Sequence, residues 1–242
     1  MNKTLIMIPA YNEEPNLGAL LDQLLAVAPE NSHILVIDDG STDRTVQVAR
    51  ERGVDVISQV YNMGYGSALQ LGYKFATCNG YDLVFQMDAD GQHDAQNIER
   101  MRRIMEQDGA PDILIGSRFL EGSESFRVSS VRRLAIGLFR MIIRRMSKMT
   151  ITDPTSGLQA LKRSAFSFYA QYQNFDYDYP DINMIVQMGY NGYTLREFPA
   201  VMHARQFGQA MHSGIWKPFV YMIVMMLSTI NVYFRRKRRR AA

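Results

Sequence analysis

Short apolar runs alternate with longer segments of helical periodicity over the first 117 residues of the chain. We interpret five of the runs as strands because they are short and almost wholly apolar. They lie at residues 4–9, 33–38, 55–59, 82–88 and 112–117. The helical patterns between them begin near Glu14, Asp43, Gly66 and Asp94. This order predicts an α/β fold with a mostly parallel central sheet that helices cover on both faces.

The pattern changes after residue 116. An apolar segment rich in arginine predicts a helix at 131–149, a turn follows at 152–157, and a last apolar run occupies 218–234. Neither an internal repeat nor a linker is visible in the sequence. We therefore expect one domain over residues 1–212, followed by a C-terminal apolar helix and basic tail at 213–242.

Four polar stretches follow predicted strands. They read AYNEE at residues 10–14, DDGSTD at 38–43, NMGYG at 62–66 and DADGQHD at 88–94. Because parallel strands bring their carboxyl ends to one edge of a sheet, we expect these stretches to form one ligand-binding edge. Ser41 or Thr42 would also cap the helix that follows the second stretch, with Asp43 favouring its dipole.

Asp88 and Asp90 are the strongest candidates for chemistry. Side chains at positions i and i+2 of a strand lie on one face, so the two carboxylates can converge on one divalent cation. Mg²⁺ and Mn²⁺ prefer oxygen ligands, and Mg²⁺ commonly takes some of them from substrate phosphates. Asp176 and Asp178 form a second pair of this kind, but only the first pair directly follows a predicted strand of the sheet.

Other metal and phosphate motifs do not fit. Asp88, Asp90 and Glu99 match positions 1, 3 and 12 of an EF-hand loop, but His93 stands where that loop requires glycine, and a strand leads into it. Residues 64–72 lack the spacing of a dinucleotide-binding glycine motif, and the sequence contains no P-loop lysine motif.

Seven motifs, in this order and spacing, resemble those of family 2 glycosyltransferases of the GT-A fold. They are MIPAYNEEPNL, VIDDGSTDRT, NMGYGSALQLGY, FQMDADGQHD, IGSRF, DPTSGLQA and EFPAVMHARQFGQAMHSG. Within that family the chain is most similar to the dolichol-phosphate mannose synthase-like branch, whose bacterial members glycosylate undecaprenyl phosphate. The resemblance spans nearly the whole chain. It implies metal-dependent, inverting transfer of a sugar from a UDP- or GDP-sugar to a polyprenyl phosphate at the cytosolic membrane face.

The resemblance also implies roles for individual residues. The nucleotide base and ribose would be bound by Pro9, Tyr11, Glu13 and Asp39. The cation, Mg²⁺ or Mn²⁺, would be held by Asp88, Asp90 and Gln92, with Ala89 in contact with the substrate. The phosphates would lie near Arg118 and Arg205, and catalysis would depend on Asp90 and Arg205. Family members often carry a serine where this chain has Ala210, so a serine contact there is not expected.

The acceptor decides whether a protein base is needed. A lipid phosphate is already an anion at neutral pH and needs no base. A sugar hydroxyl of a cell-envelope glycan or glycolipid would need a carboxylate, and Asp178 and Asp181 are the available candidates. Those two residues would otherwise form a loop and a helix N-cap.

Basic residues are clustered although the net charge is only +3. Six of the 27 lysines and arginines form the run RRKRRR at residues 235–240, and a second arginine cluster lies within 127–145. Both clusters predict an anionic partner surface. We interpret residues 127–149 as an amphipathic helix on a membrane surface, with an apolar face that contains Leu134, Leu138, Met141 and Ile142. A core helix with a solvated arginine face is the alternative.

Residues 218–234 form a largely apolar run at the lower limit for crossing a bilayer. A single crossing with the basic tail in the cytosol would place the domain on the far side, away from nucleotide sugars. We therefore expect a helix in the cytosolic leaflet, with the tail bound to anionic headgroups. A true span and packing between copies of the chain are the alternatives.

Composition and motifs narrow the remaining classes of protein. The 242 residues are 47% hydrophobic and 21% charged, which is typical of a globular domain, and we expect a cytosolic location because no signal-like segment precedes the first strand. The single cysteine, Cys78, excludes an intrachain disulfide and is expected to be packed. A nucleotidyltransferase would carry a glycine-rich loop after the first strand. A basic adaptor for membranes or nucleic acid would have no use for carboxylates at successive strand ends, so we expect no nucleic-acid partner.

Overall fold

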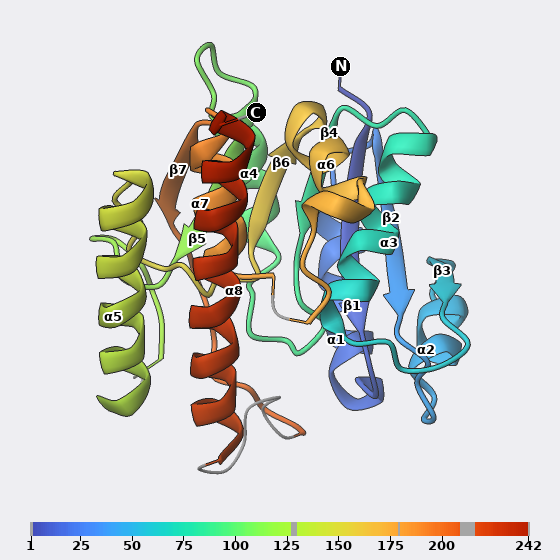
Figure 1. Cartoon of the computed structure of the whole chain (residues 1–242). Coiled ribbons are helices and arrows are strands. Elements are labelled where there is room, and N and C mark those ends of the chain that lie inside the picture. Colours follow the sequence, from blue (N-terminus) through green and yellow to red (C-terminus); the bar gives the residue numbers. More distant parts are fainter. Residues whose placement is uncertain (1, 127–129, 179, 209–215, 242) are drawn as a thin grey trace.

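The computed structural model describes residues 2–126, 130–178, 180–208 and 216–241 (Figure 1). Within these residues, seven strands form one sheet in the order β3-β2-β1-β4-β6-β5-β7. Neighbouring strands are parallel, except that β6 runs antiparallel to β4 and β5. The predicted α/β fold with a mostly parallel sheet is confirmed.

Six of the seven strands point the same way and bring their carboxyl ends to one edge of the sheet. These are β1 (Thr4–Ala10), β2 (Ser32–Asp38), β3 (Asp55–Ser58), β4 (Leu83–Gln86), β5 (Ile113–Ser117) and β7 (Leu195–Pro199). The antiparallel strand is β6 (Gln159–Lys162). Every residue of β1 is buried, because helices cover both faces of this central strand.

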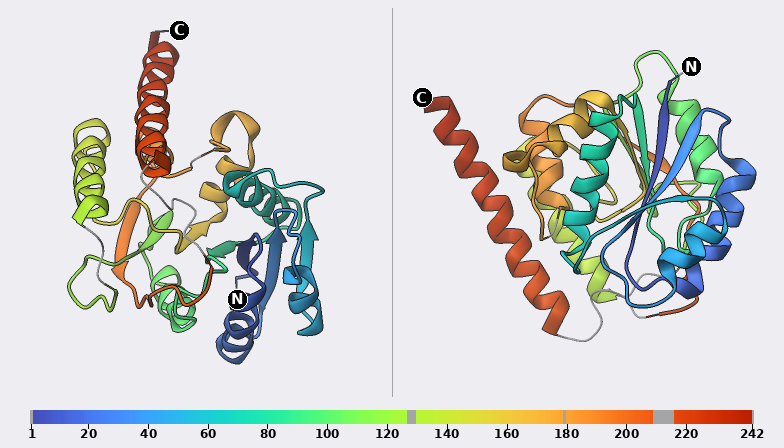
Figure 2. Two further views of the ribbon diagram at one scale, coloured as in Figure 1. Left: turned by 90° about the horizontal axis from the view of Figure 1, so that it is seen from below. Right: turned by 90° about the vertical axis from the view of Figure 1, so that its right-hand side faces the viewer.

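Helices pack on both faces of the sheet (Figures 1 and 2). One face is covered by α1 (Glu14–Val27), α2 (Thr45–Glu51) and α4 (Gln96–Met105). The other is covered by α3 (Tyr65–Cys78), α5 (Ser130–Ser147), α6 (Arg163–Ala170), α7 (Ile182–Tyr190) and α8 (Trp216–Ala241). A short 3-10 helix, η1 (Tyr172–Asn174), follows α6.

Two hydrophobic cores result, one on each face. Successive side chains of β1 point to opposite faces, so Leu5 and Met7 belong to the core under α3, while Ile6 and Ile8 belong to the core under α1. Cys78 ends α3 and is exposed, so the prediction that it is packed was wrong. The predicted boundary between residues 212 and 213 lies outside the described residues, as does Ala210.

The helix α5 has both a core face and an exposed apolar face. Its core face contains Ile136, Phe139 and Ile143, which are almost completely buried. Leu134 and Met141 are 77% and 60% exposed. The predicted apolar face was partly wrong, because Ile142 packs against the core and Leu138 is half-buried. The buried face agrees with the alternative of a core helix, and membrane contact of the exposed face stays a prediction.

The helix α8 packs on α7 and lies on the same side of the molecule as α5 (Figure 2). It leaves a long stripe of apolar side chains exposed. Its buried side includes Met225 and Thr229. The exposed stripe consists of Val220, Ile223, Met226, Leu227, Ile230, Tyr233 and Phe234. Among the described residues, no helix combines the length and the apolar character that a membrane crossing requires.

Candidate active site

The loops after β1 and β2 are tied together at the carboxyl edge of the sheet. The side chain of Asn12 accepts a hydrogen bond from the Thr42 N–H at 2.8 Å, and Ser41 Oγ accepts one from the Asn12 N–H at 2.9 Å. Ser41 and Thr42 therefore join the two loops, and the prediction that one of them caps α2 was wrong. The N-cap position of α2 is Arg44, which makes no side-chain cap hydrogen bond, and the Asp43 carboxylate accepts a hydrogen bond from the N–H of Thr45, the first residue of α2, at 2.9 Å.

The first loop presents the predicted nucleotide-binding residues in different environments. Tyr11 is 44% exposed, whereas Pro9 is buried within β1. Glu13 is buried, and its carboxylate accepts a hydrogen bond from Asn16 Nδ2 at 2.6 Å. Burial raises the pKa of Glu13, against the opposing effects of the Asn16 hydrogen bond and the nearby Arg205. The loop thus offers one open aromatic ring beside one enclosed carboxylate.

Asp39 lies at the end of β2 and organises the turn before α3. Its Oδ1 accepts hydrogen bonds from Gln59 Nε2 at 2.9 Å and from the Met63 N–H at 2.7 Å, and its Oδ2 accepts one from the Gly64 N–H at 2.9 Å. Burial raises the pKa of Asp39, and the two backbone hydrogen bonds act against that rise. Asp39 therefore has a structural role, and its contact with a ribose stays a prediction.

The loop after β4 carries the three predicted metal ligands. The strand ends at Gln86, so Asp88 and Asp90 lie beyond it, and the prediction that strand alternation puts them on one face was wrong. A turn with Gly91 at φ 71° shapes this loop instead, and Asp90 Oδ1 accepts a hydrogen bond from the Gln92 N–H at 3.0 Å. The two carboxylates are close enough to interact. Burial raises the pKa of Asp88, and the charge of Asp90 raises it further.

Asp88 is held on several sides. Its Oδ1 accepts a hydrogen bond from the hydroxyl of Tyr65 at 2.8 Å. Its N–H donates to Nδ1 of the buried His93 at 3.3 Å, so His93 supports the loop backbone. Its Oδ2 lies against Gly157, where a Cβ would come within 2.2 Å of it. Any side chain at residue 157 would therefore displace this carboxylate.

The donor set fits a divalent cation. Asp88, Asp90 and Gln92 supply carboxylate and amide oxygens from one loop, and these are the ligand types that Mg²⁺ and Mn²⁺ prefer. Because residue 157 is a glycine, the Asp88 carboxylate fits against the backbone there. In the part of the chain that the structure describes, no group of three or more His, Cys, Asp and Glu side chains is arranged to hold a metal. A cation at this loop would share its coordination with substrate phosphate oxygens.

Arg205 connects the loop after β1 to the loop after β4. Its guanidinium forms a short ion pair with Glu13, and its Nη1 lies 3.6 Å from Asp90 Oδ2. Its Nε donates to the Phe207 carbonyl at 2.8 Å, and Asn16 Nδ2 approaches the same carbonyl at 3.4 Å. The segment after β7 therefore folds over both acidic loops and places one cation between two predicted binding carboxylates.

Arg118 is buried and already paired. Its Nε and Nη2 donate to the two carboxylate oxygens of Asp153 at 2.6 and 2.7 Å, and Nη2 also donates to Thr155 Oγ1 at 3.0 Å. Burial opposes its charge, but the hydrogen bonds and charge of Asp153 outweigh burial and raise the pKa of Arg118. A bidentate pair of this kind fixes the loop after β5 to the turn before β6. The predicted contact of Arg118 with a phosphate stays untested.

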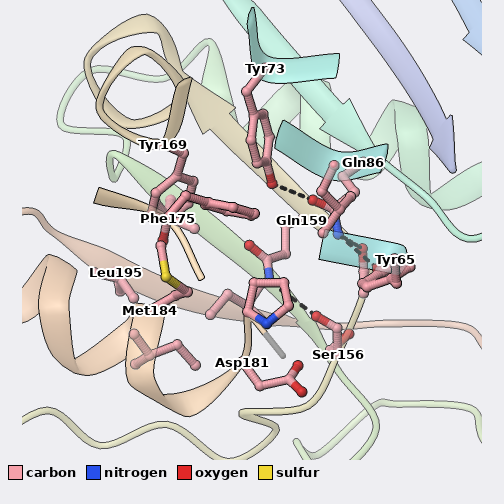
Figure 3. Close-up of a pocket in the computed structure, with 16 residues that line it drawn as sticks. Tyr65, Tyr73, Gln86, Ser156, Gln159, Tyr169, Phe175, Asp181, Met184 and Leu195 are labelled. Carbon is pink, nitrogen blue, oxygen red and sulfur yellow. Dashed lines mark hydrogen bonds between the residues drawn. The ribbon is translucent and has the colours of Figure 1, made fainter. Parts of the chain in front are cut away.

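A small cavity of about 20 Å³ lies next to Gln86 at the end of β4, and this is about the space of one water molecule (Figure 3). Polar groups of Tyr65, Gln86 and Ser156 line it together with Asp181. Asp181 Oδ2 accepts a hydrogen bond from the Tyr221 hydroxyl of α8 at 2.5 Å. Asp178, the other candidate base, is exposed. The two candidates therefore lie in different environments.

Sequence reasoning missed several residues that shape this site. They are Asn16, Tyr65, Asp153 and Gly157. Each was visible inside a quoted motif, but their roles depend on contacts with residues far away in the chain. Gly157 could have been identified from its position in the predicted turn at 152–157.

A family model described as glycosyl transferase family 2 matches residues 5–169. A polyprenol monophosphomannose synthase of Mycolicibacterium smegmatis is 30% identical over 231 residues, which are 88% of this chain and 82% of that protein. An undecaprenyl-phosphate mannosyltransferase of Micrococcus luteus is 28% identical over 219 residues, which are 88% of each chain.

A solved structure shares the fold at low sequence identity. It is the glucosyl-3-phosphoglycerate synthase of Mycobacterium tuberculosis in complex with Mn²⁺ and UDP-glucose. The TM-score is 0.67 at 16% identity, over 95% of this chain and 78% of that one.

Proposed function

The chain belongs to glycosyl transferase family 2, and on that premise we propose that it moves a sugar from a nucleotide-sugar donor to a polyprenyl phosphate. The family predicted from the seven sequence motifs is thereby confirmed, and the chain is a glycosyltransferase. The observation that carries the proposal is the position of Arg205 between Glu13 and Asp90 at the carboxyl edge of the sheet. This arrangement suits a donor whose nucleoside lies on one loop and whose diphosphate lies on the other.

Acidic residues of the site would bind the nucleoside and the cation of the donor, and a basic residue would bind its diphosphate. Glu13 and Asp39 are acceptors for base and ribose donors, and the exposed ring of Tyr11 offers an apolar surface to the base. Asp88, Asp90 and Gln92 would hold Mg²⁺ or Mn²⁺, which when bound would neutralise charge on the diphosphate. Arg205 would exchange Glu13 for the diphosphate as charge develops there.

On the acceptor side, a lipid phosphate would act as the nucleophile without help from a protein base, because it is ionised at neutral pH. The protein would then contribute position, by holding that phosphate in line with the anomeric carbon. Inversion at that carbon follows from a single in-line displacement. The names of the two polyprenyl-phosphate relatives support this acceptor over a sugar hydroxyl.

Replacement of the candidate bases distinguishes the two acceptors. If the acceptor is a lipid phosphate, Asp178→Asn should transfer sugar at a rate within about threefold of the wild type, because the exposed carboxylate is not needed. We expect the same of Asp181→Asn, since an amide oxygen can still accept the Tyr221 hydrogen bond. The measurement is the initial rate of label transfer. A loss of 10²-fold or more in either variant, which is the lower range for removing a general base, would favour a sugar hydroxyl as acceptor.

The proposed activity is tested directly with a panel of radiolabelled UDP- and GDP-sugars and polyprenyl phosphate vesicles. We expect one donor to give label that partitions into organic solvent, and its formation should stop when the divalent cation is chelated. Label that stays in the aqueous phase with every donor would contradict the lipid acceptor.

We further propose that the chain works at the cytosolic face of a membrane, held there by α5 and α8. The helices α5 and α8 lie on the same side of the molecule (Figure 2). Both expose apolar side chains, Leu134 and Met141 on α5 and the apolar stripe on α8. Exposed arginines at 133, 144 and 145 flank the first of these surfaces. Apolar side chains beside basic ones favour the interface of an anionic membrane.

Charged substitutions on this side should weaken vesicle binding. In a variant with both Leu134→Asp and Leu227→Asp, two side chains that are 77% and 61% exposed become charged. We expect at least about a 10-fold drop in partition onto anionic vesicles, because each lost apolar contact contributes about 1.5 kcal/mol or more. Cosedimentation with vesicles measures the effect.

Leu25→Asp is the matched control, because Leu25 is 51% exposed on α1 at the opposite face of the sheet. Its vesicle binding should equal that of the wild type. If the double variant still binds vesicles fully but changes its mass in light scattering, this surface joins copies of the chain, and the membrane proposal is wrong.

A further inference from the structure

The hydroxyl of Tyr65 has no place in the proposed reaction, yet it contacts a predicted metal ligand. Tyr65 is the first residue of α3 and belongs to the NMGYG segment. Its hydroxyl donates to Asp88 Oδ1 at 2.8 Å and accepts from Gln86 Nε2 at 3.2 Å. The single proton of this hydroxyl is therefore directed at the carboxylate.

A chain of hydrogen bonds fixes that direction (Figure 3). The hydroxyl of the buried Tyr73 donates to Gln86 Oε1 at 2.5 Å. The amide nitrogen of Gln86 donates both to Tyr65 and to the Gly157 carbonyl, the latter at 2.9 Å. Because an amide oxygen only accepts and an amide nitrogen only donates, Gln86 has one orientation here. From Tyr73 through Gln86 to Tyr65, each residue therefore donates one hydrogen bond to the next, and Tyr65 donates to Asp88.

The opposite side of Asp88 is limited by packing. A Cβ at Gly157 would come within 2.2 Å of Asp88 Oδ2, so glycine is what leaves room for this oxygen. One carboxylate oxygen is thus fixed by a hydrogen bond, and the other occupies space that only glycine provides. A carboxylate held in this way loses less rotational freedom when it binds a cation.

We propose that Tyr65 is a positioning residue for the cation site, which holds the Asp88 carboxylate in its binding orientation. The inference rests on the proposed function, which assigns a divalent cation to Asp88, Asp90 and Gln92. Removal of a hydrogen-bond partner behind a metal ligand typically lowers metal affinity by about 10- to 100-fold.

Tyr65→Phe tests the inference through metal binding. The probe is Mn²⁺ added to the purified full chain with UDP present, and free Mn²⁺ is quantified by electron paramagnetic resonance. We expect the Kd for Mn²⁺ to rise by about 10-fold. The Mn²⁺ concentration for half-maximal transfer should rise in parallel, while the rate at saturating Mn²⁺ falls by less than about threefold. The variant should fold, because Gln86 keeps the Gly157 carbonyl as acceptor for its amide nitrogen.

Tyr73→Phe is the matched control, because it removes a hydroxyl from the same chain of hydrogen bonds without touching Asp88. Its Kd for Mn²⁺ should stay within about twofold of the wild type, even if its melting temperature falls. The inference is overturned if Tyr65→Phe binds Mn²⁺ as tightly as the wild type, or if both variants lose affinity equally. Absence of Mn²⁺ binding by the wild type would instead refute the metal assignment of the proposed function.

Discussion

Asp90→Asn is expected to lower sugar transfer by about 10³-fold and to leave the fold intact. The asparagine side chain keeps an oxygen that can accept the Gln92 N–H, so the loop after β4 should retain its shape. The substitution removes the negative charge with which Asp90 would bind the proposed divalent cation. A loss of 10³-fold corresponds to about 4 kcal/mol at the transition state, which is within the range for metal stabilisation of a leaving group. Initial rates of label transfer at saturating cation measure the effect.

Asp94→Asn is the control for that experiment. Asp94 lies four residues further along the same loop, where its carboxylate accepts the Gln96 N–H at the start of α4 and contacts His203. The control should lower the free energy of unfolding by about 1 kcal/mol and change the transfer rate by less than about threefold. Asp90→Asn with wild-type activity would remove Asp90 from the metal site, provided that the variant melts as the wild type does.

The sheet could be predicted because its signal is local. Residues 4–9 and 33–38 are apolar runs with polar stretches after them, and the structure places β1 and β2 at these positions. The gathering of the polar stretches at one edge followed from the parallel order of the strands. The predicted arrangement of Asp88 and Asp90 on one face of a strand was wrong. The strand β4 ends two residues before Asp88, and a turn at Gly91 shapes the loop instead.

The contacts inside the site could not be predicted, because they join residues that are distant in the chain. Arg205 meets Glu13 across 192 positions, and only the folded sheet brings them together. Tyr65 reaches Asp88 because α3, which packs against β1 and β2, begins beside the loop after β4. The motif resemblance could name Arg205 as a candidate, but it gave no indication of its ion pair.

The two surface helices show what periodicity leaves open. An apolar stripe at helical spacing does not say whether it faces a core, a membrane or both. In α5, Ile142 packs against the core, and Leu134 is exposed. A test of membrane binding should therefore replace the exposed Leu134 and not Ile142, which packs against the core.

The ion pair between Arg205 and Glu13 has a consequence for the donor. Both partners are largely enclosed, with side-chain exposures of 22% and 12%, so neither charge is well solvated. If the donor binds as proposed, the nucleotide sugar replaces this ion pair with its own contacts to Arg205 and Glu13. The diphosphate can provide them for Arg205, because a guanidinium binds two phosphate oxygens at once. The ribose or base can provide them for Glu13 through its hydroxyl or N–H donors.

Arg205→Ala should therefore lower the rate of transfer by about 10²-fold, which is the usual loss for one donor that stabilises a developing negative charge. Arg205→Lys should recover only part of that loss, since an ammonium cannot form the two parallel hydrogen bonds of a guanidinium.

Arg196→Ala is the control, because Arg196 is exposed on β7 and its replacement should leave the rate of transfer unchanged. The kcat and KM for the donor, measured for all three variants, separate the possibilities. A fall in kcat assigns Arg205 to the leaving diphosphate, whereas an unchanged kcat with a higher KM restricts it to binding. Wild-type values for both would mean that Arg205 only holds the segment after β7 against Glu13.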